Sequence, residues 1–373
     1  MVVGNNRKRK SLTDIESLPD EVLFEVLVRL PAQDIHDSVR LVCSKWYRMT
    51  RTHTFIYAHL QHSTYGLLFQ SKDKDPFFMA VGESGRVEIS KNSYNKLRCQ
   101  QPFFMGVGTS CNGLVLESKE HTNNNIYVSN PATRQIIHLR PLVGYRIASQ
   151  LFAIGYAAAS MKYKAIVLFT PGQGMKKICC ILTIGVDNSW RTIGKGSVSL
   201  AATHIYNRTP LITEGFLHWY DIYSNKVLTL NVETEIFTET SGPTTEGYQR
   251  NTYLSTGRYL SLLRPCGEFC WEVWEMKPKI DYRLRKVWDI SFEDNKCSTF
   301  QRFKSYEFLF PIGWLKYLEI LVFFTLSFGI HSQVVVYNLL THEIVTIELP
   351  VPAPRSDYDL VVHKDSLVSL GGC

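Results

Sequence analysis

The cysteines of this sequence are its most reactive residues, and their spacing does not match a metal site. Nine cysteines occur in 373 residues, and no Cys-x-x-Cys pair of the kind used by zinc sites is among them. Cys266-x-x-x-Cys270 is the nearest approach, and no histidine follows it at zinc-finger spacing. Cys179 and Cys180 adjoin within an apolar run, so as strand residues they point to opposite faces of a sheet. We therefore expect no metal and no cofactor, and we expect the cysteines to pack as small hydrophobic residues.

The motifs of common catalytic centres are also missing from the sequence. It contains no GxxxxGK[ST] phosphate loop, no HExxH helix and no GxSxG nucleophile elbow. His218 adjoins Trp219 in a strand-like run, and the sequence places no acidic residue beside it. We interpret His218 as a buried, hydrogen-bonded strand histidine rather than as a catalytic base. We predict that the chain is not an enzyme.

Composition and charge favour a globular protein with no membrane or nucleic-acid partner. The formal net charge is +7, and the clearest basic cluster is Arg7 to Lys10, which is either a nuclear address or a solvated tip. The longest apolar run, Leu318 to Ile330, is too short to span a bilayer. Met1 to Ser17 is polar and basic, unlike a secretory signal. We therefore expect a nuclear or cytoplasmic location, where a reducing environment keeps the cysteines as free thiols.

The hydrophobic period that positions these residues is helical up to about residue 60. From Leu18, apolar residues recur at three- and four-residue spacing, which predicts a helix begun by Pro19 and ended by Pro31. A second helical segment is predicted from Asp34 to Thr52. Helices this short cannot hide all their apolar side chains, so part of the face must pack on the rest of the chain or on a partner.

After Tyr65 the sequence changes to short alternating runs separated by turn residues, which predicts many short strands. A strand, an Asn-x-x-Thr turn and a second strand occur at Asn130, Asn231 and Asn338. Asn favours such turns because its side chain accepts hydrogen bonds from the backbone just beyond it. With two similar hairpins between these copies, hairpins recur about every fifty residues, the period of kelch-type propeller blades. We predict an all-β propeller of about six blades, with an irregular β-sandwich as the alternative.

The N-terminal residues resemble an F-box, and the remainder resembles the plant F-box-associated domain. LPDEVLFEVLVRLP, from Leu18 to Pro31, and the run from Val39 to Met49 match the F-box order across the module. Cys111 to Leu114 followed by Asn130 to Thr133 is similar to the CNGL…NPxT signature of the second domain. One departure is Ala157, where that family usually has an acidic residue. We therefore expect an α+β multi-domain chain with a disordered basic tip at residues 1–11, a helical F-box module at 12–60 and a propeller-like domain at 61–373.

The resemblance implies a substrate-recognition subunit of an SCF-type cullin-RING ubiquitin ligase. F-box modules dock on a Skp adaptor, which links them to cullin and RING subunits, and the second domain holds a target protein for ubiquitination and degradation. A scaffold protein that binds the adaptor without causing degradation is the alternative. The apolar helical stripe fits a helix-docking interface, and an internal helix–helix contact is the alternative for any single residue on it, above all for Val42 and Trp46. The residues expected to contact the adaptor, or to support that contact, are Leu18, Pro19, Val22, Leu23, Leu27, Leu30, Pro31, Val42 and Trp46.

The sequence leaves the target protein and the residues that bind it unassigned. Recognition surfaces lie on loops, and loops vary on a common scaffold. A propeller enzyme or lectin with an incidental helix pair is a third interpretation, and it requires a converging cluster of polar residues that the scattered acids do not indicate. The candidate target-binding loops, which we rank equally, are Ser71–Phe77, Glu120–Asn125, Ser241–Asn251 and Ser291–Phe300.

Overall fold

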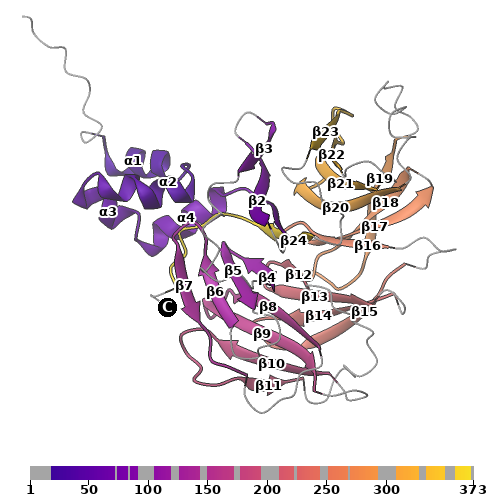
Figure 1. Ribbon diagram of the computed structural model, residues 1–373, viewed down its shortest axis with the longest axis horizontal. Helices are drawn as coiled ribbons and strands as arrows, with labels where there is room; N and C mark the ends of the chain where they lie inside the picture. The colour runs from indigo at the N-terminus through magenta and orange to yellow at the C-terminus, as the bar shows by residue number, and fades with distance from the viewer. Residues whose placement is uncertain are drawn as a thin grey trace, which may run out of the picture.

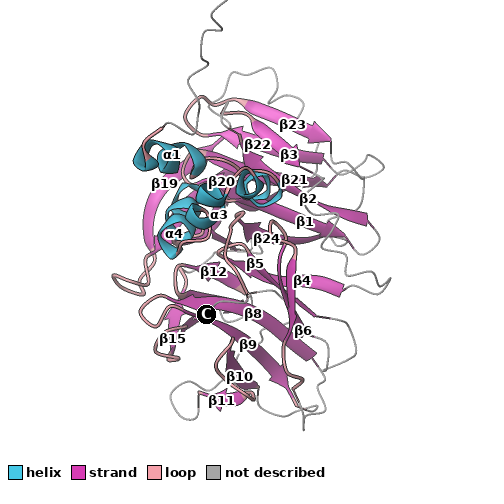
Figure 2. Ribbon diagram, turned by 90° about the vertical axis from the view of Figure 1, so that its left-hand side faces the viewer, coloured by secondary structure: helices cyan, strands magenta, loops and turns pink. Residues whose placement is uncertain are grey.

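Short helices and a ring of strands form the two parts of the molecule. The computed structural model describes residues 18–71, 74–82, 85–90, 105–118, 126–142, 149–171, 177–194, 210–221, 225–243, 251–267, 269–292, 308–326, 333–348 and 358–370. The predicted basic cluster, Arg7 to Lys10, lies outside these residues. Figures 1 and 2 show the helices grouped on one side of the strands. They are α1 (Asp20–Leu27), α2 (Ala32–Asp37), a 3-10 turn (Val39–Leu41), α3 (Ser44–Met49) and α4 (His53–His62).

Two prolines precede the first two helices. α1 begins directly after Pro19, whose fixed φ suits a helix start. We expected Pro19 at the first helical position, and the structure places it one residue earlier, at the N-cap. Asp20 and Glu21 in the first turn favour this end through the helix dipole. Pro31 has the same place before α2, while α1 itself already ends at Leu27.

The second predicted helical segment, Asp34 to Thr52, requires a correction because the structure divides it. The backbone leaves the helical region at Ser38, with φ −129° and ψ −58°, and is extended at Cys43, with φ −158° and ψ 169°. Neither position is a glycine or a proline, so the sequence carries no strong stop signal there. The breaks fold the pieces back on one another, and Ile35 and Trp46 enter the same core.

The strands form a β-propeller of six four-stranded antiparallel sheets, which confirms the predicted fold (Figure 1). Blade 1 contains β1 (Gly66–Ser71), β2 (Lys74–Val81), β3 (Val87–Ser90) and β24 (Tyr358–His363). Blade 2 contains β4 (Met105–Cys111), β5 (Leu114–Ser118), β6 (Ile126–Asn130) and β7 (Gln135–His138). Blade 3 contains β8 (Ser149–Ala157), β9 (Lys162–Thr170), β10 (Ile178–Thr183) and β11 (Arg191–Ile193).

The remaining three blades repeat this order along the chain. Blade 4 contains β12 (Leu211–Thr213), β13 (Phe216–Asp221), β14 (Lys226–Asn231) and β15 (Phe237–Ser241). Blade 5 contains β16 (Thr252–Ser255), β17 (Leu260–Gly267), β18 (Cys270–Met276) and β19 (Arg285–Ser291). Blade 6 contains β20 (Phe308–Lys316), β21 (Ile320–Leu326), β22 (Gln333–Asn338) and β23 (Ile344–Glu348).

A strand from the far end of the chain closes the ring. β24 pairs with β1 from Gly66 opposite His363 to Ser71 opposite Tyr358. β24 also lies against β4 of the next blade, and β1 lies against β20 of the last one. The first blade is therefore completed only by the last strand.

The repeated Asn turns join the third and fourth strands of blades 2, 4 and 6. The Oδ1 atoms of Asn130, Asn231 and Asn338 each accept two backbone hydrogen bonds, at 2.9–3.3 Å, from the residues two and three positions on. The next residue in each copy has a left-handed φ of 58°, 61° or 58°. The predicted side-chain chemistry of the turn is confirmed.

The hydrophobic core lies between neighbouring blades. Cys180 packs in the cluster between blades 2 and 3, while Cys179 packs in the cluster between blades 3 and 4, so their side chains do point to opposite faces. His218 is 1% exposed and its two ring nitrogens lie 2.9 Å from the hydroxyls of Thr213 and Thr229. Burial lowers the His218 pKa to about 3, so the ring is neutral. The interpretation of His218 as a satisfied strand histidine is confirmed.

The prediction that the cysteines are free thiols, most of them packed as small hydrophobic residues, is wrong for one pair. Cys266 and Cys270 form a disulfide at the β17–β18 hairpin, where their Cα atoms are 5.3 Å apart. Cys266 is exposed, so neither apolar packing nor burial protects its sulfur. The four-residue spacing brings the two residues together because the chain reverses between them. Among the described cysteines, Cys43, Cys111, Cys179 and Cys180 are free.

Candidate functional site

The segment that follows β24 joins the helices to the propeller. Asn130 Nδ2 donates hydrogen bonds to the carbonyls of Ser366 and Val368, at 3.0 and 2.8 Å. Ser366 Oγ donates to the carbonyl of Asn112 at 2.6 Å. A Cβ at Gly113 would lie 2.2 Å from Ser366 Oγ, so glycine is required for this close approach. These contacts hold residues 364–370, hereafter the tail segment, in a fixed position against blade 2.

Apolar and charged contacts hold the helical module against the tail segment and blade 2. Leu367 of the tail segment and Ala132 of blade 2 pack in the same core as Phe55 of α4. Arg134, at the Asn130 turn, forms an ion pair with Asp37 of α2. The helical module is thus continuous with the propeller along α4.

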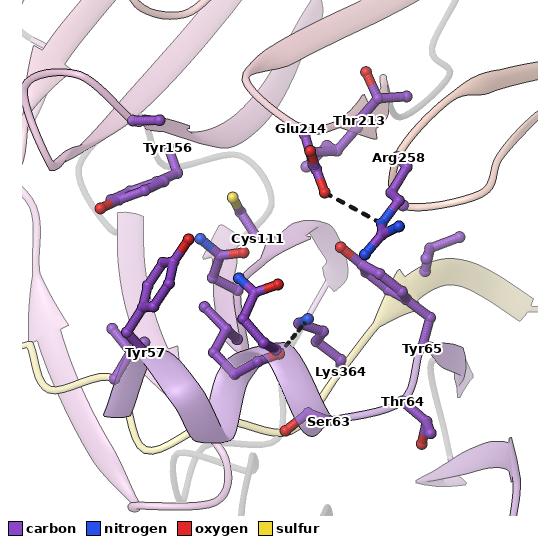
Figure 3. Close-up of a pocket in the computed structure, with 18 of the residues that line it drawn as sticks. Tyr57, Ser63, Thr64, Tyr65, Cys111, Tyr156, Thr213, Glu214, Arg258 and Lys364 are labelled. Carbon is purple, nitrogen blue, oxygen red and sulfur yellow. Dashed lines mark hydrogen bonds and ion pairs between the residues drawn. The ribbon is translucent and has the colours of Figure 1, made fainter. Parts of the chain in front are cut away.

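A cavity of about 2110 Å³ lies between α4 and one face of the propeller. Figure 3 shows Tyr57 of α4 pointing towards Tyr156 across this space, with Lys364 beside the last turn of α4. Much of the rim is formed by the turns that lead into the second strands of the blades. Gly113, Gly215 and Gly257 open three of these strands with φ values of 82°, 81° and 84°.

One carboxylate and two cations stand at the blade 4 and blade 5 side of the cavity. Glu214 Oε1 lies 3.5 Å from Arg258 Nε, and its other oxygen lies 2.8 Å from Lys279 Nζ (Figure 3 shows the first pair). The side chains of Arg258 and Lys279 are 62% and 64% exposed, so these pairs contribute little to stability. The single carboxylate leaves this group with a net positive charge.

Lys364 places a second positive charge deeper in the cavity. It is 7% exposed, its Nζ donates to the carbonyl of Leu60 at 2.5 Å, and it lies 4.6 Å from the centre of the Tyr65 ring. Burial lowers the Lys364 pKa to about 8, with Glu214 acting in the opposite direction and Arg258 in the same one. Burial also raises the Tyr65 pKa. Lys364 is therefore a largely desolvated cation at neutral pH.

The cavity also contains the buried thiol of Cys111. Burial raises the Cys111 pKa to about 12, so this thiol stays protonated and is a poor nucleophile. Within the described residues, no group of three or more His, Cys, Asp or Glu side chains is arranged to hold a metal ion. None of the helices in the described part of the chain is long and apolar enough to cross a membrane.

The nine residues expected at the adaptor contact differ in exposure. Leu23, Leu27 and Trp46 are 1%, 2% and 7% exposed and pack in the core of the helical module. They can support an interface but offer no free surface to a partner. The exposed or half-buried ones are Leu18, Pro19, Val22, Leu30, Pro31 and Val42.

Two further exposed residues extend the apolar surface. Val22 and Val26, one turn apart on α1, are 46% and 47% exposed. Leu41 and Val42, at the end of the 3-10 turn, are 69% and 54% exposed. We define these four residues as the apolar stripe. Val26 follows from the four-residue spacing on α1, whereas the exposure of Leu41 depends on the unpredicted break at Ser38.

The candidate target-binding loops lie largely beyond the described residues. Glu120–Asn125 falls wholly outside them, and Ser71–Phe77, Ser241–Asn251 and Ser291–Phe300 do so in part. Sequence reasoning did not find the cavity. A signal was present in the sequence, because Asn112, Glu214 and Arg258 each adjoin a glycine that precedes the second strand of a blade.

Comparisons with known proteins agree with this two-part architecture. The F-box-like family matches residues 15–62, and the F-box associated beta propeller domain family matches residues 65–256. F-box protein At5g49610 of Arabidopsis thaliana is 24% identical over 274 residues, which cover 69% of this chain and 74% of that protein. Putative F-box only protein 15 of the same plant is 27% identical over 188 residues. That match covers 48% of this chain, and the chain spans about half of that relative's length, 47%.

Solved structures resemble the chain only distantly. A nidogen/laminin complex aligns with 80% of this chain and 98% of its own, at 12% identity and a TM-score of 0.42. We draw no argument from a likeness this low. The two family matches are specific, and one of them covers more than half of the sequence. The chain belongs to the plant F-box proteins that carry an F-box-associated β-propeller domain.

Proposed function

We propose that this chain is the substrate-recognition subunit of an SCF-type ubiquitin ligase, acting in the nucleus or cytoplasm. The helical module docks on a Skp adaptor, and through it on cullin and RING subunits. The propeller binds a target protein, which is then ubiquitinated and degraded. An F-box paired with an F-box-associated propeller supports a substrate-adaptor role in SCF complexes, and F-box proteins are generally receptors rather than enzymes.

The observation that carries the proposal is the separation of two surfaces. The apolar stripe lies on α1 and the 3-10 turn, while the cavity is lined mainly by α4 and the propeller, together with Ile35, His36 and Arg40 of the helical module. Leu23 and Leu27, on the neighbouring face of α1, already pack in the core of the module. Exposed aliphatic side chains beside a complete core are typical of a partner interface. One surface is therefore available for an adaptor while the other holds a target.

The docking surface is tested by co-purification with a plant Skp adaptor. Val22→Asp/Val26→Asp places two charges on the apolar stripe without entering the core, and we expect at least a roughly 30-fold loss of adaptor binding. The matched control is Val345→Asp, because Val345 is 52% exposed on outer strand β23 of the propeller. Full adaptor binding by the α1 variant would contradict the proposal.

Deleting residues 1–60 is a poorer test than these substitutions. α4 spans His53–His62 and forms one wall of the cavity, and Lys364 bonds to its Leu60 carbonyl. The deletion would therefore remove the adaptor surface and disturb the target surface together. Point variants on α1 separate the two functions.

The alternative, a scaffold that binds the adaptor without causing degradation, differs in its effect on bound proteins. We would identify proteins bound by the propeller in plant cells and measure their half-lives with the intact chain and with Val22→Asp/Val26→Asp. A receptor is expected to shorten the half-life of a bound protein, and the α1 variant should lengthen it again. Equal half-lives in both lines would favour the scaffold.

A further inference from the structure

We propose that the cavity between α4 and the propeller binds an extended acidic segment of the target protein, whose carboxylates reach Arg258, Lys279 and Lys364. This inference rests on the proposed function, since it names the kind of peptide that the receptor recognises. It assigns the target contact to the face beside the helical module rather than to the loops considered from the sequence.

The size of the cavity favours a peptide over a small molecule. Pockets for single small ligands measure roughly 300–1,000 Å³, whereas this cavity measures about 2110 Å³. Its lining extends from Arg51 and His53, at the start of α4, to Lys277 and Tyr317 of blades 5 and 6. An extended chain is the ligand shape that contacts both ends at once.

The charge of the lining selects the sign of the ligand. Among the described lining residues, seven are Lys or Arg and two, Glu214 and Glu233, are acidic. Lys277 and Lys316 are neutralised by Glu275 and Glu319 just outside the cavity, which still leaves seven cations against four carboxylates. A cleft with low-dielectric walls concentrates such a field, and acidic ligands are attracted to it.

Arg258, Lys279 and Lys364 are the cations best placed to receive carboxylates. Arg258 and Lys279 share the carboxylate of Glu214, so among the described residues one positive charge of this group is uncompensated. Among the described residues, Lys364 contacts the Leu60 carbonyl and the Tyr65 ring. A buried cation gains most from an anion that arrives with a peptide, because the interaction is screened little by solvent.

Tyrosines supply the rest of the surface. Tyr57, Tyr156, Tyr259 and Tyr317 line the cavity from α4 and from three blades. Tyrosine offers a flat apolar face and a hydroxyl, which suits contacts to both the backbone and the apolar side chains of a peptide. Acidic residues interspersed with apolar ones therefore fit the cavity better than a purely acidic run.

The test is selection from a random peptide pool by the full-length chain bound to its adaptor. Peptides about twelve residues long span about 40 Å when extended. We expect the retained peptides to contain about threefold more Asp and Glu than the input pool, and the enrichment to fall at high salt. The variant Arg258→Gln/Lys279→Gln removes two exposed cations and is expected to reduce the enrichment to near the input value.

A matched control removes the same charge elsewhere. Arg283 and Arg285 are exposed near β19, outside the cavity lining, so Arg283→Gln/Arg285→Gln should keep the enrichment. Retained peptides no more acidic than the input, or equal enrichment by both double variants, would overturn the inference. Adaptor co-purification on the same preparations separates the two proposals. If Val22→Asp/Val26→Asp loses adaptor binding but still retains acidic peptides, the result concerns only the adaptor surface. If adaptor binding is intact but the retained peptides are not enriched in Asp and Glu, only the cavity inference is refuted.

Discussion

Val22, Val26 and Val42 of the helical module are about half exposed, whereas Val334 and Val335 of the propeller are fully buried. These valines thus have opposite environments in the two parts of one chain. The propeller closes on itself and buries most of its aliphatic side chains between blades, while single ones such as Val345 are exposed on outer strands and turns. The module has a small core and exposes several apolar side chains within one short helical segment. The difference supports the proposal that the module is completed by a partner, while the propeller offers a cavity.

The comparison is tested most severely by removing one large side chain from each part. Phe55 is fully buried in α4, 5.2 Å from the Phe24 ring, and Phe69 is 1% exposed in blade 1, 4.6 Å from the Phe77 ring. Phe→Ala at either site should cost about 3–5 kcal/mol. We expect Phe55→Ala to abolish adaptor binding and the helical circular-dichroism signal, and Phe69→Ala to lower the midpoint of propeller unfolding. One shared transition, lowered equally by both, would show that the parts unfold as a single unit.

The contact between the tail segment and blade 2 is tested by the same substitution in three copies of one turn. Asn130 is 1% exposed and binds the tail segment as well as its own turn, so Asn130→Ala should cost about 3 kcal/mol in urea unfolding. For Asn231 and Asn338, the described hydrogen bonds of the side chain stabilise only the turn, and Ala there should cost about 1 kcal/mol. Hydrogen exchange in the tail segment should rise in the Asn130 variant alone. Equal costs at all three positions would mean that the hydrogen bonds between Asn130 and the tail segment add nothing to stability.

Inside the propeller, the buried acid Glu117 predicts that stability depends on pH. Glu117 is 4% exposed, and burial raises its pKa to about 7 although Ser129 donates a hydrogen bond to it. Because the folded pKa is above the ordinary value of 4.5, the protonated form is favoured in the fold. Stability is then lost as pH rises from about 4.5 through 7.

Glu117→Gln removes this titration while keeping the shape of the side chain. We expect the variant to be more stable than the parent by about 2 kcal/mol at pH 8, and nearly equal to it at pH 5. Urea unfolding at the two pH values measures the difference. A constant difference at both pH values would show that Glu117 does not titrate in this range.

The smallest effect is expected at the Cys266–Cys270 disulfide. The β17–β18 ladder already holds the two residues together, so the bond closes only a short loop. Cys266→Ser/Cys270→Ser should change the free energy of unfolding by less than about 1 kcal/mol. Reductant should shift the parent to the level of the variant and leave the variant unchanged. A loss of several kcal/mol would make this hairpin the weakest part of an otherwise self-supporting ring.

The propeller was predictable because its signals are local and repeated. Each Asn turn is determined by one side chain and the backbone just beyond it, and the period-two runs identify the strands without long-range information. The six-blade ring follows from the spacing of these hairpins. The start of α1 was displaced by only one residue, at Pro19.

The rest depends on residues that are distant in sequence. Asn130 and Asn231 are indistinguishable in their turns, and only the folded chain shows that Asn130 holds the tail segment. Lys364 and Arg258 come together because the ring brings blade 1 and blade 5 to one face. The break at Ser38 and the Cys266–Cys270 bond were missed because neither has a marker that distinguishes it from an ordinary helix or an ordinary core cysteine.

Ring closure by β24 determines when folding of the propeller can be completed during synthesis. Strand β1 leaves the ribosome early and waits for a partner that is synthesised after all the other strands. Closing a loop of this size is slow compared with forming the hairpins within a blade. The tail segment that seats the helical module directly follows β24, so ring closure and module docking share the same late step. A nascent or truncated chain that lacks residues 358–370 has neither the β1–β24 pairing that closes the ring nor Lys364 in the cavity. Under the proposed function, such a chain would not bind a target until synthesis has passed this point.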